Sequence, residues 1–268
     1  MQMKQTKLDS LKHHLRELGS VAIAFSSGVD STFLLKTAYD LLGDRTLAIT
    51  VHSRLSPQRE LDEAVQFTHN EGIEHIIIEI DELTIPGFSK NSANRCYLCK
   101  TEIFSRIRRI AGEQNIPHVI EGSNADDCDD YRPGLQAIAE LGILSPLREV
   151  GLTKQEIRQL SRELGLPTWN KQSFACLASR IPYGEEITKE RLAMIDVAEQ
   201  YLQDVGFHQV RVRFHGNLAR IEIDGEGWQL LADKTLRGAI HCRFKEIGFV
   251  YIAVDLLGYR TGSMNETL

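Results

Sequence analysis

Hydrophobic and polar positions along the first two thirds of the chain alternate between helix and strand patterns. Leucines three or four residues apart between positions 8 and 18 predict an amphipathic helix that ends at Gly19, and the apolar run at 21–25 predicts a buried strand. The same alternation predicts strands at 47–51, 75–80 and 118–121 and helices at 31–42, 57–71, 97–111 and 153–165, the last with the capping-box pair Thr153 and Glu156. Strands separated by helices predict an α/β fold, a parallel sheet with helices on both faces.

The C-terminal third has a different pattern. An irregular stretch through Gly184 precedes a helix predicted at 188–205. In the strand predicted at 210–215, apolar residues take one face and Arg211, Arg213 and His215 take the other. The remaining elements are strands predicted at 218–223 and 249–256 and a helix predicted at 234–247. We place a domain boundary near residue 184, with an α/β domain at 1–184 and a smaller α+β domain at 185–268.

Composition limits the kinds of molecule that this protein is expected to bind. The 268 residues carry a formal net charge of −6, which argues against a protein that grips nucleic acid through a broad basic surface. Hydrophobic residues at 42% and charged residues at 25% are typical of a globular protein. No apolar run approaches the roughly 20 residues that span a bilayer, and the first helix lacks the apolar centre of a signal peptide. We therefore expect a cytoplasmic protein with no nucleic-acid or membrane partner.

A loop of small residues joins the first predicted strand to the helix after it, where open α/β sheets bind ligands. Small residues let backbone N–H groups approach an anion, and the helix N-terminus favours negative charge. The candidate nucleotide contacts are Ser26, Ser27, Gly28, Asp30, Ser31 and Thr32. A carboxylate beside phosphates needs a cation between them, so Asp30 is the candidate Mg²⁺ ligand. The alternative is that these side chains only cap the helix.

The loop matches neither the Walker nor the dinucleotide-binding pattern. It resembles the S-G-G-x-D-S loop of enzymes that cleave ATP between its α- and β-phosphates, the PP-loop ATP pyrophosphatases. Ser27 stands where that pattern has its first glycine. If this position takes a positive φ, Ser27 adds backbone strain.

Two other segments end predicted strands at the same edge of the sheet. In the segment 121–127, Gly122 would allow close approach to the nucleotide, and Asp126 and Asp127 would bind metal or ribose or else form an acidic surface turn. After the second strand, His52 and Ser53 are candidates to touch adenine or ribose.

Five cysteines, an odd number, favour thiol chemistry or metal binding over a disulfide framework. Cys96 and Cys99 have C-x-x-C spacing. Cys176 lies alone in an irregular stretch between Lys171 and Arg180, whose charges would lower the pKa of its thiol. We interpret Cys128 and Cys242 as bystanders.

Four motifs together resemble the LarE family of ATP-dependent sulfur transferases. They are S-x-G-V-D-S in the loop, D-Y-R-P-G at 130–134, C-L-A-S-R-I-P-Y-G at 176–184 and R-V-R-F-H at 211–215, and the resemblance runs from about residue 21 to 265. It implies an adenine nucleotide alpha hydrolase-like PP-loop fold for the first domain. It also implies that ATP adenylates a carboxylate of pyridinium-3,5-biscarboxylic acid mononucleotide, pyrophosphate leaves, and sulfur replaces oxygen, for the nickel-pincer nucleotide cofactor.

The source of the sulfur differs between branches of that family. In one branch a lone cysteine gives up its own sulfur and becomes dehydroalanine; in the other, three cysteines hold a [4Fe–4S] cluster with an exchangeable sulfide. This chain has Cys96, Cys99 and Cys176, so we expect the cluster. The alternative is sacrifice of Cys176, in which Cys96 and Cys99 would serve only to reduce or reload it. A zinc half-site or a redox dithiol at the C-x-x-C pair is poorly supported, because no second C-x-x-C exists.

The resemblance also implies substrate contacts. It places Glu199, Arg211, Arg213 and Glu222 near the sulfur-transfer site, where the arginines suit a mononucleotide phosphate. Arg180 and Arg132 are further candidates to steady phosphate or carboxylate. The alternative is a solvated strand face with ordinary Arg–Glu pairs. The second domain would then serve phosphate binding and oligomerisation, since the relatives form rings of subunits, with transient contacts to a sulfur donor and a nickel-inserting enzyme.

Two other classes of function remain. A PP-loop synthetase that uses ammonia, or a tRNA thiolation enzyme, would share the adenylation step, but no glutaminase segment or basic tract is evident. A non-catalytic nucleotide-binding or iron–sulfur module would have the same loop, with Ser27 in place of glycine, but would catalyse no reaction.

Overall fold

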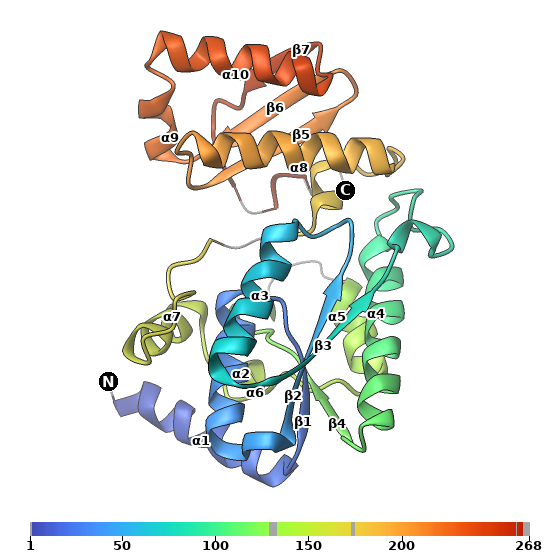
Figure 1. Ribbon diagram of the computed structural model, residues 1–268, viewed down its shortest axis with the longest axis vertical. Helices are drawn as coiled ribbons and strands as arrows, with labels where there is room; N and C mark the ends of the chain where they lie inside the picture. Colours follow the sequence, from blue (N-terminus) through green and yellow to red (C-terminus); the bar gives the residue numbers. More distant parts are fainter. Residues whose placement is uncertain (1, 129–132, 173–174, 261, 265–268) are drawn as a thin grey trace. The chain divides into compact units, whose positions relative to one another are not determined.

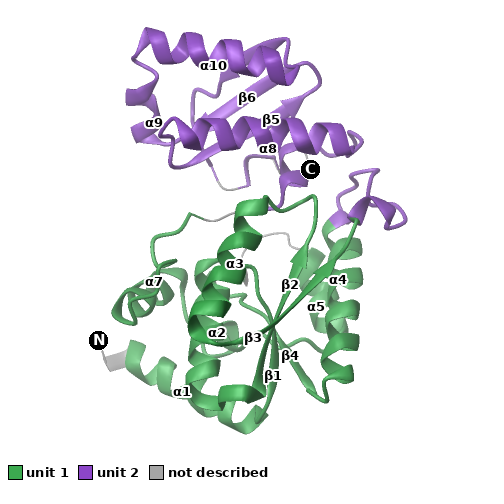
Figure 2. Cartoon of the chain, in the orientation of Figure 1, with its two compact units in different colours: residues 1–81, 96–174 green, residues 82–95, 175–268 purple. Residues whose placement is uncertain are grey.

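The computed structural model describes residues 2–128, 133–172, 175–260 and 262–264. The chain divides into two compact units (Figure 2). The first comprises Met1–Asp81 and Cys96–Phe174, and the second comprises Glu82–Arg95 and Ala175–Leu268. None of the described helices is long and apolar enough to cross a membrane.

The first unit is a parallel sheet with helices on both faces (Figure 1). Its strands lie in the order β3-β2-β1-β4. They are β1 (Val21–Ala24), β2 (Thr46–His52), β3 (Glu74–Glu79) and β4 (His118–Ile120). The helices are α1 (Gln2–Leu18), α2 (Val29–Leu42), α3 (Gln58–Glu71), α4 (Arg95–Glu113), α5 (Pro133–Glu140), α6 (Pro146–Glu149) and α7 (Lys154–Glu163). The predicted α/β class is confirmed.

Side-chain alternation along β1 divides the core into two layers. Val21 and Ile23 pack on one face with buried side chains of α1, α2, α3 and α7. Ala22 points to the other face, among buried side chains of α4 and α5. Because successive side chains of a strand point to opposite faces, a strand that is buried on both sides is apolar throughout. The sheet is therefore fixed from both sides, and its carboxyl edge is a rigid base for the loops that follow the strands.

The capping box predicted for the helix after residue 153 is confirmed. The Glu156 backbone N–H donates to the Thr153 hydroxyl over 3.3 Å, and the Thr153 N–H donates to the Glu156 carboxylate over 2.9 Å. The same carboxylate accepts from Lys7 of α1 at 2.8 Å. The cap therefore both starts α7 and ties the first helix of the chain to it.

The second unit contains a three-stranded sheet and its covering helices. Strands β5 (Val210–His215) and β6 (Leu218–Ile223) are antiparallel, and β7 (Tyr251–Val254) pairs in parallel with β6. The helices are α8 (Lys189–Asp204), α9 (Gly225–Leu230) and α10 (Lys234–Ile247).

This unit takes in a segment that lies between strand β3 and helix α4 in the sequence. The Gly184 N–H donates to the Asn91 carbonyl over 3.0 Å, and the Ile187 N–H donates to the Ser89 carbonyl over 2.9 Å. The Asn91 side chain donates to the carbonyl of Pro182 over 2.7 Å. These bonds join the segment to the part of the unit that begins at Ala175. A domain boundary near residue 184 stays a prediction.

Candidate active site

The loop between β1 and α2 is held by hydrogen bonds among its own small residues. The Ser26 and Ser31 hydroxyl oxygens lie 3.1 Å apart, and the Ser31 hydroxyl lies 3.3 Å from the Gly28 carbonyl oxygen. Ser27 has φ +50°, the left-handed conformation that the loop pattern suggests for its first glycine. Thr32 is fully buried, and its hydroxyl has no hydrogen-bond partner among the described residues. The first backbone N–H groups of α2 have no intrahelical partners, so this helix start suits an anion.

The segment after β4 lies against the start of α2. A Cβ atom on Gly122 would lie 3.0 Å from the Ser31 backbone nitrogen and 3.2 Å from its Cα atom. These are backbone atoms of the helix, so a side chain at position 122 would require the start of α2 to shift by a few tenths of an ångström, and the contact favours glycine. This is the close approach expected of Gly122, whereas its contact with a nucleotide stays a prediction.

Asp30 carries a buried oxygen that suits a cation. Its Oδ2 atom forms an ion pair with Lys154, and its Oδ1 atom is buried with no hydrogen-bond partner among the described residues. Burial raises the pKa of this carboxyl above its ordinary value of 3.8 and the Asp127 charge adds to that effect, whereas Lys154 and, more weakly, the Asn124 side chain oppose it. A bound cation would satisfy Oδ1 and favour the ionised form.

The acidic segment after Gly122 is largely bonded to itself and to α7. The Asp127 carboxylate accepts from the Asn124 N–H at 2.9 Å, and Asn124 Oδ1 accepts from the Asp126 N–H at 2.9 Å. The exposed Asp126 carboxylate accepts from the Lys154 N–H at 2.8 Å, so it gives a hydrogen-bond partner to the first backbone N–H of α7. Their binding of ribose or metal stays a prediction.

The candidates after β2 differ in their exposure. His52 ends β2 with its side chain 37% exposed and its Nδ1 atom 4.0 Å from the Glu79 carboxylate. Ser53 is buried, and its hydroxyl accepts from the Leu55 N–H at 3.1 Å. Arg132, the candidate to steady phosphate or carboxylate, lies outside the described residues.

The cysteines divide between the two units. Cys96 and Cys99 lie one helical turn apart at the start of α4, the first exposed and the second half-buried. Cys176 belongs to the second unit and is exposed, as is Cys242 of α10. None of these four forms a disulfide. The convergence of Cys96, Cys99 and Cys176 stays a prediction.

Arg180 and Glu199 form a buried ion pair next to Cys176. Neither side chain is exposed, and two guanidinium nitrogens lie 2.9 Å from the two carboxylate oxygens. Arg180 also donates to the carbonyl oxygens of Ala175 and Cys176, over 2.5 and 3.1 Å. Burial alone would raise the pKa of Glu199, but the charge and bonds of Arg180 hold it below its ordinary value. The pair therefore fixes the backbone that carries the Cys176 thiol.

The charged face of β5 is buried rather than solvated. Arg211 is 4% and Arg213 is 5% exposed. Arg213 donates to Glu222 over 2.7 Å and to the Ser179 carbonyl over 3.1 Å. Burial and, after it, the charge of Arg180 lower the pKa of Arg211 to about 10. An anion beside Arg211 would relieve the second of these effects.

Comparison with known proteins decides the family. No family model matches the chain. Over 264 residues, 98% of this chain and 95% of the relative, it is 36% identical to the pyridinium-3,5-bisthiocarboxylic acid mononucleotide synthase of Lactiplantibacillus plantarum. The chain belongs to the LarE family.

Other relatives set the family in a wider group. A protein of Synechocystis described as uncharacterised is 43% identical over 99% of both chains. A glutamine-hydrolysing GMP synthase chain of Archaeoglobus fulgidus is 26% identical over 69% of this chain and 65% of its own length. The GMP synthases place this LarE-family chain in the PP-loop superfamily, and it is an ATP-dependent enzyme.

The cofactors that the LarE family implies fit these residues to different degrees. The unpartnered oxygen of Asp30 fits Mg²⁺. Cys96 and Cys99, on one face of α4, have spacing suited to two ligands of an iron–sulfur cluster. In the part of the chain that the structure describes, no group of three or more His, Cys, Asp and Glu side chains could hold a metal ion.

Two lysines at the loop were not among the predicted nucleotide contacts. Lys154 reaches Asp30 across 124 residues of sequence, and Lys171 reaches Ser27 across 144. The only local signal for Lys154 is its position after the cap residue of α7. Lys171 itself belongs to the first unit, and its ammonium contacts the loop there. Its effect on the Cys176 thiol stays a prediction.

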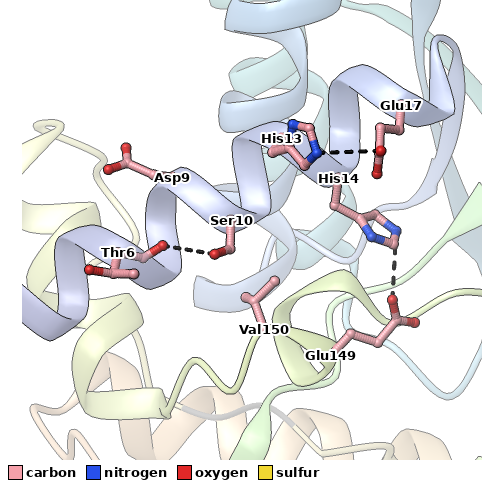
Figure 3. A pocket seen from close by; sticks show the side chains of 8 residues that line it. All are labelled: Thr6, Asp9, Ser10, His13, His14, Glu17, Glu149 and Val150. Carbon is pink, nitrogen blue, oxygen red and sulfur yellow. Dashed lines mark hydrogen bonds and ion pairs between the residues drawn. The ribbon is translucent and has the colours of Figure 1, made fainter.

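A surface hollow of about 510 Å³ lies on α1 and the end of α6 (Figure 3). The His13 Nε2 atom lies 3.3 Å from a Glu17 carboxylate oxygen, and the His14 Nε2 atom lies 3.6 Å from a Glu149 carboxylate oxygen. The lining residues are Thr6, Asp9, Ser10, His13, His14, Glu17, Glu149 and Val150. None of them is a site residue predicted from the sequence.

Proposed function

We propose that this enzyme converts the carboxylates of pyridinium-3,5-biscarboxylic acid mononucleotide to thiocarboxylates for the nickel-pincer nucleotide cofactor. The observation that carries the proposal is the 36% identity, along 98% of the chain, to a synthase named for the bisthiocarboxylic acid product. The loop at the start of α2 and the unpartnered oxygen of Asp30 support ATP activation of the acid.

The first step makes the carboxylate reactive. A substrate carboxylate oxygen attacks the α-phosphorus of ATP, the bond to the β-phosphate breaks, and pyrophosphate leaves the acyl-adenylate. The start of α2 stabilises the charge that develops on pyrophosphate, and Asp30 would hold the Mg²⁺ that neutralises it. Sulfur then attacks the acyl carbon, and AMP leaves with the electrons of the broken C–O bond.

We propose that Cys96, Cys99 and Cys176 supply the thiolates for a [4Fe–4S] cluster, which when bound would provide the sulfide for this attack. In the alternative, the Cys176 thiolate displaces AMP to form a thioester. Removal of its Cα proton then breaks the Cβ–S bond, which leaves dehydroalanine and the thiocarboxylate. The Arg180–Glu199 pair serves both routes because it fixes the backbone carbonyl of Cys176.

Arg211 and Arg213 are proposed to bind the phosphate of the mononucleotide. Arg211 combines burial with the repulsion of a neighbouring guanidinium, which a phosphate would offset. Arg213 bonds Glu222 in the absence of substrate, so Glu222 would set its position until the phosphate arrives. We also propose a homo-oligomer with transient contacts to a sulfur donor and a nickel-inserting enzyme.

Release of pyrophosphate that depends on the acid substrate tests the proposal. Anaerobically purified protein should release pyrophosphate from ATP only when the mononucleotide acid is present. Release with ammonia as the required co-substrate would favour a synthetase instead, and no release at all would favour a nucleotide-binding module.

A further inference from the structure

Ser27 holds a backbone conformation that favours glycine. Its φ is +50°, and it occupies the first glycine position of the PP-loop pattern. Residues with a Cβ atom seldom take this conformation unless the surroundings impose it. Something in this chain must therefore hold the turn that glycine adopts without help.

The contacts of Ser27 supply that restraint. Ser27 is 1% exposed, and its hydroxyl donates to the Glu60 carbonyl over 3.0 Å, with a Glu60 carboxylate oxygen 3.3 Å away. The Lys171 ammonium donates to the Ser27 carbonyl over 3.1 Å and to its hydroxyl oxygen over 3.2 Å. Both the backbone and the side chain of Ser27 are therefore bonded from outside the loop.

The Lys171 ammonium also neutralises acidic groups beside the loop. It lies 2.8 Å from the Glu60 carboxylate and 2.5 Å from the Glu63 carboxylate, and its side chain is 16% exposed. With Lys171 between them, the same groups anchor the cation that holds Ser27.

We propose that Lys171 and Glu60 are positioning residues for ATP, which hold the Ser27 turn so that this loop works without its first glycine. The inference deepens the proposed function and rests on it for turnover, whereas its effect on ATP affinity rests only on ATP binding.

The experiment is a double-mutant cycle on affinity for an ATP analogue that cannot be cleaved between its α- and β-phosphates. Lys171→Met should weaken binding roughly ten-fold, because charged hydrogen bonds to the loop are lost. In a Ser27→Gly background the same change should cost less than about three-fold, because glycine takes the left-handed turn unaided. Lys36→Met is the matched control, since Lys36 also pairs with two carboxylates, Asp40 and Glu71, but not with the loop.

The outcomes separate the roles of Lys171. An equal loss of affinity in both backgrounds would overturn the inference and make Lys171 a phosphate ligand or a general structural residue. Unchanged affinity in Lys171→Met would overturn it outright. In turnover, the Lys171→Met variant should raise KM for ATP more than it lowers kcat. Absence of acid-dependent pyrophosphate release in the wild type would refute the proposed function but leave the affinity cycle intact.

Discussion

At the scale of single residues, the buried Asp30 carboxylate suits a bound cation, but its burial lowers the stability of the fold when no cation is bound. Its folded-state pKa lies above the ordinary 3.8, chiefly because it is buried. A raised carboxyl pKa favours the folded state below the unfolded pKa, and that contribution is lost as pH rises through the folded pKa. Above its folded-state pKa, the ionised Asp30 therefore reduces stability.

Replacement of Asp30 should separate stability from activity. Asp30→Asn should raise the thermal midpoint at pH 7, with a gap to the wild type that narrows toward pH 4, and should slow pyrophosphate release at least about 100-fold. Thermal unfolding across that range and a pyrophosphate assay check both parts. Asp40→Asn, on the exposed side of the same helix, is the control. A lower midpoint for Asp30→Asn at pH 7 would contradict the account.

The Arg180–Glu199 pair has the opposite pH dependence. Because the pKa of Glu199 is lowered, its contribution to stability is present above the unfolded pKa and lost as pH falls through the folded pKa. Glu199→Gln leaves a buried guanidinium without its counter-charge and should cost about 3 kcal/mol in urea unfolding at pH 7. Glu190→Gln, an exposed carboxylate at the start of the same helix, should cost far less. Equal losses for the two variants would refute this role.

At the scale of elements, the close contact between the segment after β4 and the start of α2 favours glycine at position 122. Gly122→Ala places a Cβ atom 3.0 Å from the Ser31 nitrogen, so it should shift the loop, lower the thermal midpoint and weaken ATP binding about ten-fold or more. Gly112→Ala is the control, because nothing lies within 4 Å of its added Cβ atom. Unchanged nucleotide affinity in Gly122→Ala would exclude this contact from the site.

Periodicity predicted the long helices and the central strands, whose faces are set by local spacing. It missed α5, because Pro133 and Gly134 at its start are typical of a break. That helix packs on α4, where a Cβ atom on Gly134 would lie 3.1 Å from the Lys100 side chain. It also overextended β7, because Phe249 packs against Phe244 and Phe214 instead of entering the ladder. Tertiary packing, not local pattern, decided both.

At the scale of the whole molecule, contacts between residues far apart in sequence determine features that local sequence patterns do not predict. Asn91 joins the second unit through bonds to carbonyls of Ile181 and Pro182, 90 and 91 residues away. The loop motif and the Cys176 motif could be recognised in the sequence because each is contiguous. The contacts of Lys154 and Lys171 with the loop could not be predicted, because no local pattern indicates a partner more than 100 residues away.

The three-cysteine proposal makes a whole-molecule prediction. Anaerobically purified protein should bind about four irons per chain, and Cys96→Ala, Cys99→Ala or Cys176→Ala should each abolish retention of the cluster. Cys242→Ala should keep the full iron content. Active iron-free protein in which Cys176 loses the mass of hydrogen sulfide would instead establish the sacrificial route.

The most direct test of the account is the mass of the small-molecule product after incubation of the enzyme with ATP and pyridinium-3,5-biscarboxylic acid mononucleotide. We expect a product in which sulfur has replaced carboxylate oxygen, formed together with AMP and pyrophosphate. A product that carries nitrogen in place of that oxygen, or an unchanged acid despite intact ATP binding, would contradict sulfur transfer as the function of this protein.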